Sequence, residues 1–159
     1  FYNNENDIDL NFELSNLFIQ NFFEINDNPI SGNIESKINL NRSETNRTLS
    51  FNTSIKDINI KDDEIGNLEI YAFGNTDFDS YSVELKLTDK GKTPIYSQGT
   101  IIAINEKTNL DLDIMLENFD ISFIDKIGKN SINNLSSQIS GNVNLWGASD
   151  NLQHDGTYI

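Results

Sequence analysis

The fold of this chain is decided by the stretch LDLDIMLENFDI, residues 110–121. Every second residue from Leu110 to Leu116 is apolar, and Asp111 and Asp113 stand between them. A β-strand sends successive side chains to opposite faces, so this alternation predicts a strand with one apolar face and one polar face.

The same alternation returns in seven further runs, separated by polar breakers such as Asp89-Lys90-Gly91. Short alternating strands joined by polar turns are typical of antiparallel sheets. Helical spacing is confined to short turns near residues 20–25 and 123–127, and no long amphipathic helix is present to cover a sheet. We therefore expect an all-β fold, a repetitive antiparallel β-groove of the taco-like solenoid type with short helical turns.

The chain resembles itself at two places. Residues 8–19, IDLNFELSNLFI, match residues 110–121, and Asn16 aligns there with Asn118. The sequence ISGNI at 30–34 matches ISGNV at 139–143. These matches predict approximate units at 8–109 and 110–159, the second incomplete, within a fragment of a longer repetitive structure whose units cover one another's ends.

Composition excludes several classes of partner. Acidic residues number 25 against 11 basic ones, a formal net charge of −14. Nucleic-acid binding requires clustered Lys and Arg, and so does adsorption on an anionic bilayer surface, so we expect neither. The sequence contains no Cys, no stretch of signal-peptide type and no apolar run long enough to span a membrane. Any membrane anchor of the parent protein is expected outside residues 1–159.

The sequence offers little chemistry for catalysis. The single His, His154, is placed by its polar neighbours in a loop, where neither a nucleophile motif nor a second metal-ligating His or Cys accompanies it. Asn75, Asp77 and Asp79 begin like a calcium loop, but the pattern fails at Ser80, where Gly is needed. We therefore expect no enzyme activity, no cofactor and no metal; an enzyme that uses the abundant carboxylates is the least favoured hypothesis.

Three stretches carry a family resemblance. They are residues 110–123, in which an alternating strand runs into NFDISF; residues 139–147, ISGNVNLWG; and residues 58–103, in which DINIKDDEIGNLEIYA precedes paired strands and SQGTIIA. In this order they resemble the TamB family of AsmA-like envelope proteins, and most closely its members from Bacteroidota. The resemblance implies a non-catalytic segment of a periplasmic bridge that is anchored in the inner membrane. It further implies phospholipid transport between the membranes, support of outer-membrane protein assembly, and an outer-membrane partner barrel of the Omp85 class, similar to TamA.

An apolar sheet face without a covering helix must bury something, and acyl chains are suited to it. The residues expected to line this lipid groove are the alternating apolar sets: Ile8, Leu10, Phe12, Leu14, Ile34, Ile38, Leu40, Leu49, Phe51, Ile55, Leu68, Ile70, Val83, Leu85, Leu87, Ile102, Ile104, Leu110, Leu112, Ile114, Leu116, Ile139, Val143 and Leu145. The alternative is a secreted or surface β-sandwich, a binding or adhesin module. There the same residues fill a closed core, and Trp146, expected on the face opposite Leu145, is an exposed contact for a ligand.

Overall fold

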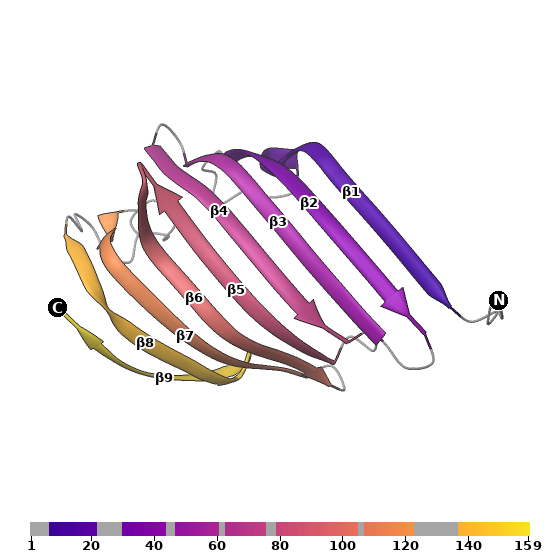
Figure 1. The fold of residues 1–159 in the computed structure, drawn as a ribbon. Helices are drawn as coiled ribbons and strands as arrows, with labels where there is room; N and C mark the ends of the chain where they lie inside the picture. The colour runs from indigo at the N-terminus through magenta and orange to yellow at the C-terminus, as the bar shows by residue number, and fades with distance from the viewer. Residues whose placement is uncertain are drawn as a thin grey trace.

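The computed structural model describes residues 7–21, 30–43, 47–60, 63–75, 79–104, 107–122 and 137–159. Nearly all of them lie in strands (Figure 1). The strands are β1 (Ile8–Phe18), β2 (Ile30–Arg42), β3 (Arg47–Ile60), β4 (Asp63–Gly74), β5 (Ser80–Asp89), β6 (Lys92–Ile104), β7 (Lys107–Asp120), β8 (Gln138–Ala148) and β9 (Asn151–Tyr158).

The strands form one antiparallel sheet in which each strand pairs with its neighbours in sequence, in the order β1 to β9. The sheet is open, because β1 and β9 are its two edges and do not pair with each other. Figure 1 shows the nine strands as a single twisted layer that bends towards β8 and β9. The predicted all-β, antiparallel fold is confirmed.

Helical structure in the described residues consists of η1, a single 3-10 turn at Ile19–Asn21, and of Ser122, the last described residue before 137. The turn η1 lies where the first short helical turn was expected, although residues 22–25 fall outside the described part of the chain. The second expected turn, at 123–127, also lies outside the described residues. Within those residues, therefore, helical cover of the sheet is limited to one end, where Ile19 of η1 packs against it.

The predicted breaker Asp89-Lys90-Gly91 forms a tight hairpin between β5 and β6. Asp89 pairs with Lys92, while Lys90 and Gly91 have φ angles of +48° and +77°. Positive φ at both central residues is the geometry whose twist matches that of the flanking strands. This polar turn is what returns the chain into an antiparallel neighbour.

The two aligned asparagines of the predicted repeat have the same backbone geometry. Asn16 and Asn118 have φ angles of +57° and +49°, and each lies at a β-bulge where the pairing register shifts. The pairing around them differs, however. Leu14 pairs with Ser36, four residues beyond Gly32, whereas Leu116 pairs directly with Gly141, the residue aligned with Gly32. The bulge is thus shared by the two matching stretches, and the division into units remains a prediction.

The enclosed core is small and lies at one end of the sheet. Ile19 of η1 packs with Ile30 and Ile60, and the partly buried residues around them are Ile34, Ile55 and Ile65. Single-layer sheets bury few side chains fully, because each face has only its own neighbours to shield it. Most of the apolar surface of the sheet therefore lies outside this cluster.

Candidate functional site

The pairing register defines one apolar face that runs across all nine strands. Residues directly opposite each other in an antiparallel pair share a face, so the registers can be followed from strand to strand. One such row consists of Phe12, Ile38, Phe51, Ala72, Val83, Gly99, Leu112, Leu145 and His154. The row beside it consists of Leu10, Leu40, Leu49, Gly74, Tyr81, Ile101, Leu110, Gly147 and Leu152. We call the face that carries these rows the apolar face.

All the residues predicted for the lipid groove occupy register positions of the apolar face, with two exceptions in β6. Ile102 pairs with Ser80 and Asn109, so it lies on the opposite, polar face. Ile104 pairs with Lys107. It stands two positions after Ile102 in β6 and so has the same strand parity as Ile102. The assignment of these two residues to the groove is corrected.

The register places Ile95 and Ile101 of β6 on the apolar face instead. Ile95 lies between Leu87 and Leu116, and Ile101 lies between Tyr81 and Leu110. The β6 residues between them on this face are Ser97 and Gly99, so the strand has no clear alternation that sequence alone could follow. Ile101 and Ile102 are adjacent, so β6 has an apolar residue on each face at this point. Only the pairing with β5 and β7 shows which of the two belongs to the apolar face.

Two further residues of the apolar face were missed because a bulge changes the alternation of β3. Asp57 has a φ angle of +53°, and its backbone N–H donates a hydrogen bond of 2.9 Å to Oδ1 of Asn67. Beyond this bulge the apolar positions are Ile58 and Ile60, both buried. The only sign of this bulge in the sequence is that the spacing of apolar residues changes from two to three between Ile55 and Ile58.

Much of the apolar face is open to solvent. At the β1 edge the exposed fractions of Leu10, Phe12 and Leu14 are 44%, 53% and 45%. Leu49, in the row of Leu10 two strands further in, is only 2% exposed. The described strands make a single layer, so no second sheet stands over these side chains, as a closed sandwich core requires.

Small and aromatic residues alternate across part of the apolar face. Gly74 lies between Leu49 and Tyr81, and a Cβ added at Gly74 would stand 2.7 Å from Cδ1 of Tyr81. The Tyr81 ring thus occupies the space over the glycine, with its centroid 6.3 Å from that of Phe51. Burial raises the pKa of Tyr81, and the negative charge of Asp79 raises it further.

The opposite face is mainly polar, although Tyr71, Phe73 and Met115 are exposed on it, and it carries its own hydrogen bonds. Lys37 contacts Glu13 at 2.9 Å, and Lys56 contacts Glu35 at 2.7 Å. All four side chains are well exposed, so each pair contributes little to stability. Trp146 lies on this face, opposite Asp111 and Gln153, which confirms its predicted position opposite to Leu145.

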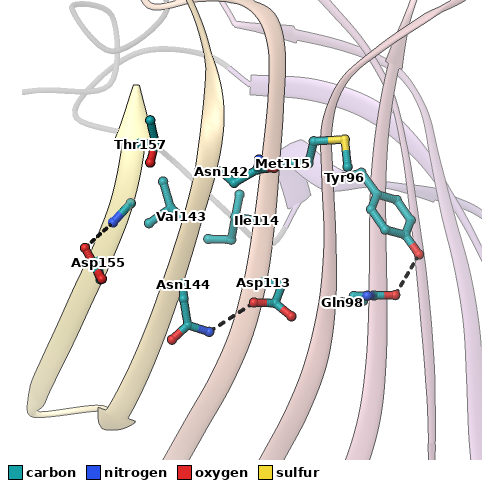
Figure 2. Close-up of a pocket in the computed structure, with 11 residues that line it drawn as sticks. Tyr96, Gln98, Asp113, Ile114, Met115, Asn142, Val143, Asn144, Asp155 and Thr157 are labelled. Carbon is teal, nitrogen blue, oxygen red and sulfur yellow. Dashed lines mark hydrogen bonds between the residues drawn. The ribbon is translucent and has the colours of Figure 1, made fainter. Parts of the chain in front are cut away.

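A shallow hollow of about 370 Å³ lies on the polar face across β6 to β9 (Figure 2). Asn144 donates to the carboxylates of Asp113, at 3.1 Å, and Asp111, at 3.4 Å, and Tyr96 donates to Gln98 at 3.2 Å. Two pairs of polar side chains in the hollow, Asn144 with Asp113 and Tyr96 with Gln98, are therefore engaged with each other. The hollow brings these amides and carboxylates together with the apolar side chains of Ile114, Met115 and Val143.

Candidate metal ligands do not gather in the described part of the chain. Its His, Asp and Glu residues form no group of three that could hold a metal ion. In the expected calcium-like turn, Asn75 Nδ2 donates to Asp79 at 2.5 Å, while residues 76–78 are not among those described. His154 was predicted in a loop; it lies instead in β9, exposed and opposite Leu145.

Across its described residues the protein has no helix of the length and apolarity that crossing a bilayer takes. Comparison of the sequence with protein-family models and with curated proteins, and of the fold with solved structures, finds no match.

Proposed function

We propose that this chain is a non-catalytic lipid-binding segment whose apolar face holds phospholipid acyl chains. The observation that carries the proposal is the apolar face itself, which continues across nine strands and which, outside the cluster around Ile19, no other described element covers. Contiguous exposed apolar surface on this scale is rare in proteins that have no partner for it. A ligand with a long hydrocarbon tail matches a long surface that is mainly apolar.

The hydrophobic effect supplies the binding energy. Removing apolar surface from water contributes roughly 25 cal/mol per Å², or about 0.8 kcal/mol for each methylene group. Phe12 and Leu14, each about half exposed, have the area to contribute to such contacts. The interior of the face contributes as well, since Leu112 and Ile114 are only partly buried.

The resemblance to the TamB family supports the wider part of the proposal. In this wider proposal, the chain belongs to a periplasmic bridge that meets an outer-membrane partner of the Omp85 class. The bridge carries phospholipid between the inner and outer membranes, or supports outer-membrane protein assembly. The alternative, a β-sandwich binding module, needs a closed core. The single layer formed by the described strands speaks against it.

Native mass spectrometry of the protein purified from cells without detergent tests the proposal, followed by lipid extraction. We expect phospholipid to co-purify with the wild type and to be lost from the double variant Leu112→Asp, Ile114→Asp, which places two charges on the apolar face. The matched control is Asn142→Asp, Gln153→Asp, which adds two acidic residues to exposed positions of the polar face. Lipid-free wild type, or equal lipid in both double variants, would contradict the proposal.

A further inference from the structure

The edge strand β1 has a neighbour on one side only among the described strands, because it pairs with β2 and with no other strand. Its apolar side chains Leu10, Phe12 and Leu14 are about half exposed. A long edge strand with apolar side chains is a template on which another strand can pair, unless Lys, Pro or a covering element protects it. Between Ile8 and Leu14 the strand has neither Lys nor Pro.

The matching stretch in β7 shows what a second neighbour does for the same pattern. Residues 112–116 align with residues 10–14, and β7 lies between β6 and β8. The three apolar side chains of 112–116 are only partly exposed, whereas their three counterparts in β1 are exposed. The pairs of β7 with β6 end at Leu116, just before the bulge that contains Asn118. What β1 lacks by comparison is an antiparallel strand opposite the residues that precede its own bulge.

We propose that β1 pairs antiparallel with β1 of a second copy of this chain, about a two-fold axis that is perpendicular to the sheet and passes through Phe12. Phe12 then lies opposite Phe12, Leu10 lies opposite Leu14 of the second copy, and Asn11 lies opposite Glu13. An isologous contact of this kind closes after two copies. The two apolar faces come to lie on the same side, so the contact extends the apolar face and does not cover it.

Symmetry and charge select this register. Residues directly opposite each other share a face, so the axis has to pass through a pair of identical residues. An axis at Leu10 sets Asp7 opposite Glu13, and an axis at Asn11 sets Asp9 opposite Glu13. An axis at Glu13 sets the two Glu13 side chains opposite each other. Like charges directly opposite each other destabilise an antiparallel pair, so these three registers are disfavoured.

Glu13 makes the difference between the registers sharper. Its carboxylate contacts the Lys37 ammonium at 2.9 Å, and a facing carboxylate would compete for the same ammonium. With the axis at Phe12, Glu13 keeps Lys37 and faces the side-chain amide of Asn11, which has N–H groups to donate. The aromatic pair at the axis adds a favourable cross-strand contact.

Disulfide cross-linking tests the register, since the chain has no Cys of its own. Residues directly opposite each other have Cα atoms about 5 Å apart, within the reach of a disulfide. Phe12→Cys should therefore form a covalent dimer on oxidation. Leu10→Cys alone and Leu14→Cys alone should not, because identical residues then lie four positions apart, about 13 Å along the strand. An equimolar mixture of the Leu10→Cys and Leu14→Cys proteins should cross-link.

Sedimentation velocity of the whole chain, free of lipid and detergent, tests the dimer itself. We expect the wild type to sediment as two chains of 18.0 kDa each. Phe12→Lys sets two ammonium groups opposite each other and should sediment as a monomer. The matched control is Leu152→Lys, on the apolar face of the other edge strand, where the side chain is 41% exposed; it should remain a dimer.

Each contrary result overturns the proposal. A monomeric wild type would rule out the dimer, and cross-linking of Leu10→Cys alone as strong as that of Phe12→Cys would rule out the register. Filaments, or loss of the dimer in Leu152→Lys, would mean that β1 pairs with β9 of the next copy instead. None of these results depends on bound lipid, so the lipid-binding function stands or falls separately.

Discussion

Ser36 and Thr53 face each other across β2 and β3 in the middle of the apolar face, and their hydroxyl oxygens are 2.8 Å apart. Ser36 is 8% exposed and is the one buried polar residue among those described. Its other neighbours in the row are Leu14 on β1 and, beyond Thr53, Ile70 on β4. The two hydroxyls satisfy each other where the surrounding side chains offer no polar partner.

Ser36→Ala removes a single oxygen atom, but it should destabilise the protein measurably because it leaves the Thr53 hydroxyl without this partner. We expect a loss of about 1 kcal/mol in the free energy of unfolding, measured by urea denaturation. The double variant Ser36→Ala, Thr53→Val replaces both partners by apolar groups and should recover most of that loss. A double variant whose loss equals the sum of the two single losses would contradict the pairing.

Asn118 lies at the β-bulge that residues 110–121 share with the matching stretch 8–19, and substitutions there test the role of its backbone geometry. Its φ angle of +49° is accessible to Gly and tolerated by Asn, but costs other residues about 1–2 kcal/mol. Asn118→Ala should lower the free energy of unfolding by about 1 kcal/mol, whereas Asn118→Gly should be nearly neutral. Asn142→Ala in β8, where φ is negative, is the matched control. Equal effects of the Ala and Gly variants at Asn118 would contradict the backbone account.

The raised pKa of Tyr81 should make the free energy of unfolding depend on pH in the alkaline range. Burial first, and then the charge of Asp79, raise the pKa of Tyr81 above its ordinary value of 10.0. The folded state thus favours the neutral phenol, so the stability from this group is complete below pH 10.0 and is lost as the pH rises through the folded-state pKa. Tyr81→Phe keeps the ring against Phe51 and removes the titration. Urea denaturation at rising pH should show the wild type losing stability relative to the variant; a difference that stays constant with pH would count against it.

The alternation of apolar residues predicts most of the fold because each strand has one apolar face and one polar face. The run from Leu110 to Leu116 corresponds to the middle of β7, and the run from Ile8 to Leu14 to most of β1. The polar turns between runs are equally local, as Lys90 and Gly91 show. Both signals depend on neighbours in sequence and on nothing further away.

The prediction fails where the face of a residue depends on pairing. Ile102 is apolar and comes directly after another apolar residue, Ile101. Its position opposite Ser80 nevertheless puts it on the polar face. His154 has polar neighbours, yet β9 extends through it because β8 offers an edge with which to pair.

The central claim is that acyl chains lie on the apolar face and not on the polar one. The chain has no Cys, so a single Cys can carry a polarity-sensitive fluorophore at any chosen position. Leu112→Cys and Asp113→Cys differ by one residue in β7 and lie on opposite faces; Ile101→Cys and Ile102→Cys do the same in β6.

The measurement is the fluorescence of each labelled variant before and after phospholipid is added. The account predicts a blue shift at positions 101 and 112 and none at 102 and 113. Equal shifts on both faces, or no shift at 101 and 112 under conditions in which lipid is bound, would contradict it.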